Sequence, residues 1–194
     1  MAEKPSDTAE RVRVQPPETL DIADRADIFL RRVGIESAEP LFRAIHANAQ
    51  YLSQYQGAWP LNATLESTKE DISERQEKAE KGEWLDYELI EAANPNVVIG
   101  KGTFFGRDQG AKTSKFGYWI VQDKAGHGYA TSIAKTMIAY GFEKWGLERI
   151  ICEITSDNEA SQQVARNVGL TPTGEYRTAP EDGSKAYEVW EIVK

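Results

Sequence analysis

Six consecutive residues, Gly126-His127-Gly128-Tyr129-Ala130-Thr131, have the types and spacing of a loop that binds an anion. Glycine lets the backbone turn sharply and come close to a ligand, and the first amides of a helix have no partner inside that helix. The positive end of the helix dipole adds to their attraction for a diphosphate. The stretch therefore predicts an anion cradle, although a glycine-rich turn that only reverses the chain would look the same by itself.

Two common nucleotide-binding loops do not fit this stretch. A dinucleotide-binding loop requires a third glycine where the chain has Thr131, and a second nucleotide-binding half for which 194 residues leave no room. A P-loop requires Gly-Lys-Ser/Thr at the end of a longer loop, and the similar string at residues 100–103 lies inside a predicted strand. The loop at residues 126–131 therefore belongs to another class of anion site.

The elements that position this loop follow from apolar periodicity and turn residues. Strands at residues 84–90, 97–105 and 115–121 predict an antiparallel meander before the loop. A helix at residues 129–145 and a strand at 149–154 then predict a β-α-β unit. The remaining expected elements are a strand at 28–30, one helix from Ser37, its N-cap, to about residue 52, a surface helix at 64–82, a helix at 158–168, and strands at 173–176 and 186–193 around a turn at 181–183.

Length and composition narrow the class of protein. The 194 residues suit one compact domain, expected at residues 26–194 after a flexible extension at residues 1–25 that mixes proline and charge. No apolar run approaches the roughly 20 residues needed to cross a bilayer, and a net charge of −8 argues against a nucleic-acid partner. The single Cys152 and the absence of a signal-like N-terminus predict a cytoplasmic protein with no membrane partner.

Three segments occur in an order that is similar to a known family. They are residues 116–120 (Phe-Gly-Tyr-Trp-Ile), residues 126–130 (Gly-His-Gly-Tyr-Ala) and residues 158–161 (Asn-Glu-Ala-Ser). Together they resemble the GNAT superfamily of N-acetyltransferases, and specifically its RimJ/RimL-like branch. The resemblance implies the GNAT fold, an α+β (α/β) arrangement in which a mostly antiparallel mixed sheet of about seven strands is flanked by about four helices.

The resemblance also implies a cofactor, acetyl-CoA, and the residues that bind it. Main-chain amides of Gly126, His127, Gly128, Tyr129, Ala130 and Thr131 would hold the diphosphate. Ile120, Val121 and Gln122 would line the pantetheine, and Asn158 would contact it from the next helix. One position departs from the family pattern: Ala125 stands where the loop usually begins with glutamine or arginine, and Lys124 is a substitute by charge alone.

Acetyl transfer to an amine requires a neutral nitrogen, a polarised thioester carbonyl and a proton for the departing thiolate. Ser161 lies where relatives place a hydroxyl near the sulfur, so it is the candidate general acid as well as a cofactor contact. As the first residues of a helix, Asn158 and Ser161 also fit ordinary capping roles. Many relatives use a glutamate as the base at the position where this chain has Lys115. Another carboxylate must therefore serve, and the candidates are Asp86, Glu88 and Glu153, of which Glu88 is chosen.

The acceptor side is predicted from aromatic residues. Tyr55 and Trp59 follow the first helix at a spacing of four, in the region that borders the acceptor groove in this branch. The expected acceptor is an amine of a protein N-terminus, a peptide or a small molecule, and the expected assembly is a monomer or a homodimer. No His, Cys or carboxylate cluster has the spacing of a metal site. Two alternatives stay open: a GNAT-fold sensor or scaffold that binds acyl-CoA without transfer, and an interaction protein without cofactor.

Overall fold

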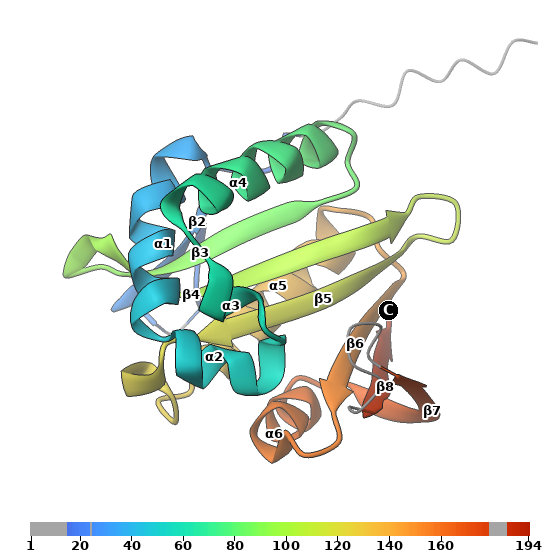
Figure 1. Cartoon of the computed structure of the whole chain (residues 1–194). Helices are drawn as coiled ribbons and strands as arrows, with labels where there is room; N and C mark the ends of the chain where they lie inside the picture. The colour runs from blue at the N-terminus through green and yellow to red at the C-terminus, as the bar shows by residue number, and fades with distance from the viewer. Residues whose placement is uncertain (1–14, 24, 179–185) are drawn as a thin grey trace, which may run out of the picture.

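The computed structural model describes residues 15–23, 25–178 and 186–194, which build one mixed sheet with helices on both faces (Figure 1). The strand order is β1-β2-β3-β4-β5-β6-β8-β7. The strands are β1 (Thr19–Asp21), β2 (Ile28–Arg32), β3 (Leu85–Glu91), β4 (Asn94–Asp108), β5 (Thr113–Ile120), β6 (Arg149–Thr155), β7 (Thr171–Thr178) and β8 (Ala186–Val193). The mixed, mostly antiparallel sheet expected from the sequence is confirmed, with eight strands among the described residues instead of about seven.

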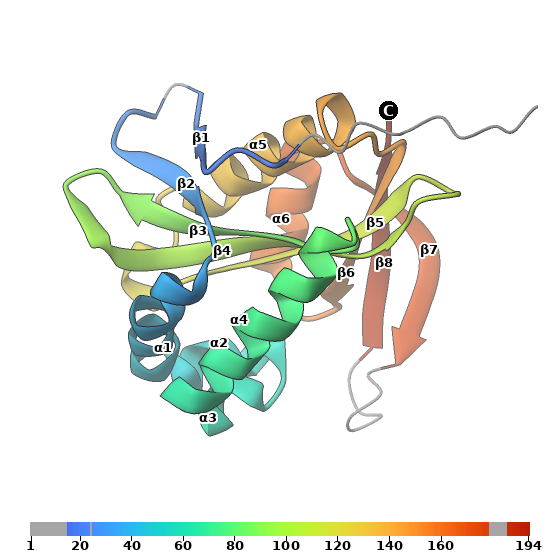
Figure 2. The same ribbon diagram turned by 90° about the horizontal axis from the view of Figure 1, so that it is seen from above.

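Helices α1 to α4 cover one face of the sheet and α5 covers the other, where α6 packs beside it (Figure 2). Their bounds are α1 (Ala38–Ala47), α2 (Ala49–Gln56), α3 (Trp59–Asn62), α4 (Leu65–Glu80), α5 (Tyr129–Glu143) and α6 (Glu159–Asn167), with short 3-10 turns η1 (Ile35–Ser37) and η2 (Gln122–Lys124). No helix in the described part of the chain is both long and apolar enough to span a bilayer.

The predicted first helix is in fact two helices, α1 and α2, which meet at Asn48. The side chain of Asn48 donates to the carbonyl of Ala44 at 2.9 Å and accepts from the amide of Gln122 at 2.9 Å. Asn48 therefore joins the helical layer to the end of β5. Ser37 occupies the N-cap position of α1 but makes no capping hydrogen bond there, because its hydroxyl donates instead to Glu88 at 2.9 Å.

One strand lies where the sequence predicted a flexible extension. Residues 19–21 form β1, which pairs with β2 in antiparallel register, and the amide of Arg32 donates to the carbonyl of Glu18 at 2.8 Å. A three-residue edge strand among prolines and charges is too short to show an alternating pattern. The predicted turn at residues 181–183 lies outside the described residues.

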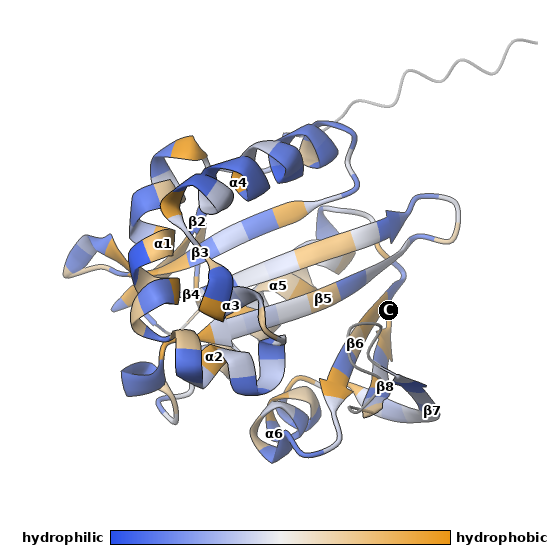
Figure 3. Cartoon of the chain, in the orientation of Figure 1, coloured by the Kyte–Doolittle hydropathy of each residue, from blue (hydrophilic) through white to orange (hydrophobic). Residues whose placement is uncertain are grey.

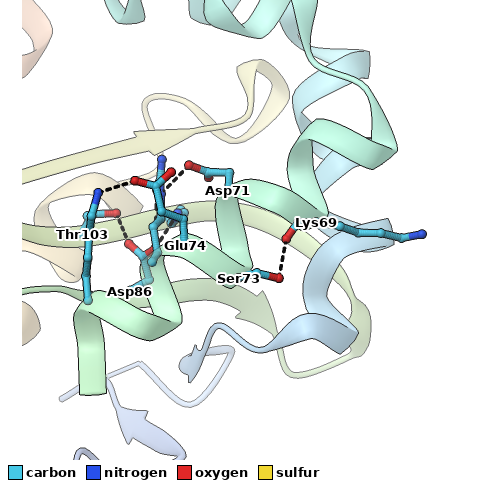
Figure 4. Close-up of polar contacts among 9 residues, drawn as sticks. Lys69, Asp71, Ser73, Glu74, Asp86 and Thr103 are labelled. Carbon is cyan, nitrogen blue, oxygen red and sulfur yellow. Dashed lines mark hydrogen bonds and ion pairs between the residues drawn. The ribbon is translucent and has the colours of Figure 1, made fainter. Parts of the chain in front are cut away.

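Helix α4 was predicted as a surface helix, and Figure 3 shows its mostly hydrophilic ribbon lying over the sheet. The Thr64 side chain caps it by accepting from the Ser67 amide at 3.0 Å. Beneath α4 the sheet carries a buried ion pair, Asp86 with Lys101 at 3.0 Å. Asp86 also accepts from the Thr103 hydroxyl at 2.5 Å, and both lie below α4 in Figure 4.

The β-α-β unit predicted around the glycine loop is confirmed, with β5 and β6 parallel and α5 between them in sequence. The two strands pair over only three positions, Thr113 with Arg149, Ser114 with Ile150 and Lys115 with Ile151. Beyond them β5 continues to Ile120 paired only with β4, and β6 continues to Thr155 paired only with β8. The sheet therefore opens between these strands.

Candidate active site between the parted strands

A cavity of about 470 Å³ occupies the place where β5 and β6 part. Its lining comes from the two strands, from α2, α5 and α6, and from the last hairpin. The lining residues considered below are Gly117 and Tyr118 of β5, Glu153 and Thr155 of β6, and Asn158 and Ser161 at the start of α6. Tyr118 is distant in sequence from Glu153 and Ser161, and all three meet where the sheet opens between β5 and β6.

The backbone of β5 turns polar groups toward this opening. The side-chain amide of Gln56 donates to the carbonyl of Tyr118 at 3.3 Å, so this carbonyl faces the cavity and not β4. The amide and carbonyl of one strand residue point to the same side, and neighbouring residues alternate. The amide of Tyr118 therefore also points toward the opening, where it is a free donor for a carbonyl of a bound molecule.

Tyr118 carries a second feature that sequence reasoning missed. Its hydroxyl is buried and has no hydrogen-bond partner among the described residues, and the same holds for the hydroxyl of Thr155. Burial raises the pKa of Tyr118, while an interaction with the Ser161 side chain lowers it to a smaller extent. A buried hydroxyl without a partner costs free energy unless a ligand or water satisfies it. The signal was present, because Tyr118 stands in the middle of the segment at residues 116–120.

Asn158 and Ser161, both predicted as site residues, lie on the cavity wall. The Asn158 side chain accepts from the amide of Ser161 at 3.0 Å and caps α6. Asn158 therefore does have the capping role, and that role fixes the first turn of α6 so that Ser161 faces the same space as Tyr118. Capping and ligand contact are compatible here.

Glu153 is the carboxylate that the structure brings to the cavity. It accepts from the ammonium of Lys115 at 2.8 Å and forms a second, short ion pair with Arg177. All three side chains line the cavity, and two cations face one anion. The Lys115 that replaces the expected glutamate is thus the partner of a carboxylate on the neighbouring strand.

Glu88, the base candidate chosen from the sequence, is placed elsewhere. Its side chain is 0% exposed, and one of its oxygens accepts from Arg31 at 2.6 Å and from Ser37 at 2.9 Å. Burial raises its pKa more than Arg31 lowers it. Glu88 does not line the cavity, and neither does Asp86, which is held between Lys101 and Thr103. Glu88 therefore lies outside the cavity, where Arg31 of β2 and Ser37 of η1 hold its carboxylate, and a role for it as the base stays a prediction.

The predicted anion loop has the geometry of a cradle. Gly126 and Gly128 adopt positive φ angles of 78° and 79°, and the carbonyl of Gly128 accepts the first helical bond, from Ser132 at 3.0 Å. Among the described residues, the main-chain amides of residues 126–131 have no hydrogen-bond acceptor. The loop does not itself line the cavity, but Ala134 and Ile138 do, and they follow Ala130 at spacings of four on one face of α5.

The other predicted contacts are divided between the cavity and its surroundings. Ile120 and Val121 are buried in the core, and the amide of Gln122 is taken by Asn48, so none of the three lines the cavity. Phe116, Gly117 and Tyr118, slightly earlier on β5, occupy that position. Tyr55 lines the cavity as predicted for the acceptor side, whereas Trp59 is 45% exposed and does not.

Comparison with known proteins agrees with this arrangement. The family described as "Acetyltransferase (GNAT) domain" matches residues 27–171, which include β2 to β6, α6 and the cavity's central residues. The chain belongs to the GNAT acetyltransferase family. This confirms the family that the three sequence segments resemble.

Among curated relatives of this GNAT domain is the uncharacterized N-acetyltransferase YoaA of Bacillus subtilis strain 168, 29% identical over 107 residues. The match covers 54% of the chain and 60% of YoaA, so the chain spans about three fifths of that relative. The fold is shared with RimL, a ribosomal L7/L12 α-N-protein acetyltransferase in complex with coenzyme A, at a TM-score of 0.81 and 19% identity over 91% of this chain and 98% of that chain.

A second solved structure, the microcin C7 self-immunity acetyltransferase MccE in complex with acetyl-CoA and AMP, has a TM-score of 0.81 and 21% identity. It covers 93% of this chain and 98% of its own. Both structures confirm the GNAT fold over nearly the whole chain. In the described part of this GNAT domain no group of three or more His, Cys, Asp or Glu side chains gathers as a metal site would.

Proposed function

We propose that the protein is an acetyl-CoA-dependent N-acetyltransferase that moves an acetyl group directly onto a primary amine in a ternary complex. The observation that carries the proposal is the cavity between β5 and β6, with a row of free backbone amides beyond one end and the Lys115–Glu153 ion pair at the narrow end where the strands join. The names of YoaA, RimL and MccE support the same activity.

The chain's own groups fit coenzyme A. Amides of residues 126–131 are free to bind the diphosphate, and the Tyr118 amide and the cavity wall are free to bind amide and carbonyl groups. Acetyl-CoA supplies an activated acetyl group as a thioester. Donors fixed in advance by β5 polarise a carbonyl at no cost in reorganisation when the reaction occurs.

Two hydroxyls are placed to donate a proton to a departing thiolate. Ser161, the candidate from the sequence, is held by the cap of α6, and the Tyr118 hydroxyl lies beside it without another partner. We assign Ser161 as the proton donor and Tyr118 as the group that orients it or replaces it. A phenol is the stronger acid in water, but burial of Tyr118 raises its pKa, which favours Ser161 acting together with Tyr118.

Glu153 is proposed as the group that binds the acceptor nitrogen and takes its proton, directly or through a water. Its ion pairs with Lys115 and Arg177 keep the carboxylate in the cavity wall. The cationic partners also favour an acceptor with a carbonyl or carboxylate near its amine, as in the α-amine of a peptide. RimL is named as an enzyme that acts on a ribosomal-protein α-amine, which supports an acceptor of this kind.

A thiol-release assay tests the proposal. Purified protein, acetyl-CoA and a panel of short peptides, polyamines and amino-acid amides should release coenzyme A only when an acceptor amine is present, and mass spectrometry should find the acetylated amine. Ser161→Ala should lower turnover and leave acetyl-CoA affinity nearly unchanged. Acetyl-CoA binding without any amine-dependent release would instead support a sensor, and no binding at all would reject both functions.

A further inference from the structure

Arg25 lies on the glycine loop although it is more than one hundred positions earlier in the chain. Its Nη1 donates to the carbonyl of His127 at 3.4 Å, and its guanidinium carbon lies 4.7 Å from the centre of the Tyr129 ring. Nη1 also lies 3.9 Å from the position that a β-carbon would take at Gly128. The turn between β1 and β2 thus places a cation directly on residues 127–129, the start of α5.

This guanidinium is held in one orientation. Asp27 accepts from Nε and from Nη2 of Arg25, each at 2.8 Å, and the Tyr129 hydroxyl donates to the same carboxylate at 3.5 Å. Hydrogen bonding from Arg25 lowers the pKa of Asp27 to about 2, so the pair stays ionised at neutral pH. Nε and Nη2 both donate to Asp27, whereas Nη1 has only the 3.4 Å bond to the carbonyl of His127. The side chain is 28% exposed, and Nη1 carries a second N–H that the single bond to His127 leaves unused.

The other basic side chains of the loop region are less available. Lys124 forms an ion pair with Glu91 at 2.6 Å. The ammonium that the sequence offered in place of the family's glutamine or arginine therefore already has a partner inside the protein. The Nδ1 of His127 contacts the carbonyl of Ala125 at 2.9 Å. Among the described residues around the loop, Arg25 is the cation whose guanidinium contacts the main chain of the loop, at the carbonyl of His127.

We infer that Arg25 binds the diphosphate of coenzyme A together with the amides of residues 126–131. The inference rests on the proposed function, because it assumes that these amides hold the cofactor. A guanidinium presents several N–H donors in a plane and bonds phosphate oxygens more specifically than an ammonium does. Asp27 and Tyr129 orient it, so little side-chain entropy is lost when the phosphate binds.

The test is calorimetry of the full chain with coenzyme A, 3′-dephospho-coenzyme A and pantetheine, the last by competition. Arg25→Ala should weaken the affinity for coenzyme A and for dephospho-coenzyme A by about tenfold each, the loss of one charged hydrogen bond. It should leave the affinity for pantetheine, which has no diphosphate, unchanged. Arg25→Lys should recover only part of the loss.

Arg32→Ala is the matched control, because Arg32 lies on the adjoining strand and pairs with Glu18 at 2.9 Å, away from the loop. It should leave all three affinities unchanged. Equal weakening of all three ligands by Arg25→Ala would mean that Arg25 only supports the loop, and weakening limited to coenzyme A would assign it to the 3′-phosphate; either result overturns the inference. If the wild-type chain itself binds no coenzyme A, the proposed function fails first.

Discussion

The ammonium of Lys115 lies 2.8 Å from the carboxylate of Glu153, at the point where β5 and β6 stop pairing. Lys115 belongs to the last joined pair, and Glu153 is two residues beyond its partner, Ile151. This ion pair therefore lies at the narrow end of the opening between β5 and β6. Tyr55 of α2 lines the same cavity as this ion pair.

Glu153→Gln should lower kcat/KM for the amine acceptor by about a hundredfold, because the variant cannot accept a proton. The KM for acetyl-CoA should change little, since the proposed cofactor contacts lie on the other side of the opening. Steady-state kinetics with each substrate varied in turn make this measurement. Loss of acetyl-CoA affinity with an unchanged acceptor step would contradict the role of Glu153.

Glu191→Gln is the matched control for Glu153→Gln. Glu191 is also paired with an arginine, Arg149, and its side chain is 29% exposed compared with 24% for Glu153, but it does not line the cavity. The control should keep turnover within about twofold, because Glu191 does not line the cavity and the loss of a partly exposed ion pair costs the fold little stability.

Tyr118→Phe should separate stability from activity. Removing a buried hydroxyl that has no partner should leave the free energy of unfolding unchanged or raise it slightly, while kcat/KM should fall about tenfold. Tyr87→Phe is the opposite case, because the Tyr87 hydroxyl donates to the carbonyl of Pro17 at 2.7 Å. It should cost about 1 kcal/mol of stability and leave turnover unchanged. Chemical denaturation and kinetics on both variants provide the comparison.

Glu88→Gln tests the carboxylate that the sequence favoured as a base. Turnover should remain within twofold, because Glu88 does not line the cavity and is held by Arg31 and Ser37. Since burial raises the pKa of Glu88 in the folded protein, its contribution to stability is complete below its unfolded pKa of about 4.3 and is lost as pH rises through the folded value. The stability of the variant relative to wild type should therefore improve between pH 4 and pH 7 in urea titrations. A constant difference across this range would show that Glu88 has an ordinary pKa.

Cys152 should resist alkylation although it lines the cavity. Burial raises the pKa of its thiol to about 12, and only the thiolate reacts. At pH 8 iodoacetamide should label the folded chain roughly a thousandfold more slowly than the chain in guanidinium. Intact-mass spectrometry over time measures both rates. Fast labelling of the folded chain would show a thiol that is far more acidic than its surroundings imply.

Most of the fold was predictable because its signals are local. The strands on both sides of the glycine loop, the helix after it and the cap at Asn158 follow from periodicity and turn residues that are close in sequence. The break between α1 and α2 was not predictable, because Asn48, where it occurs, accepts a hydrogen bond from the amide of Gln122, 74 positions away. The strand β1 was missed because three residues cannot display a pattern.

The site was predictable in part for the same reason. Asn158, Ser161 and Tyr55 reach the cavity wall as expected, since each lies in or next to a recognisable segment. The sequence could not decide among Asp86, Glu88 and Glu153, because all three lie on predicted strands and only the three-dimensional arrangement shows that Glu153 lines the cavity. The pairing of Lys115 with Glu153 and the position of Arg25 depend on contacts across the sheet and across the chain.

The short seam between β5 and β6 also has a consequence for how the protein is made. During synthesis on the ribosome the first five strands and α5 emerge before β6, β7 and β8, and they can pair with one another without the later strands. The cavity cannot exist until the C-terminal part has been translated and has joined at three residue pairs. A nascent chain that lacks β6, β7 and β8 should therefore not hold the proposed cofactor in this cavity.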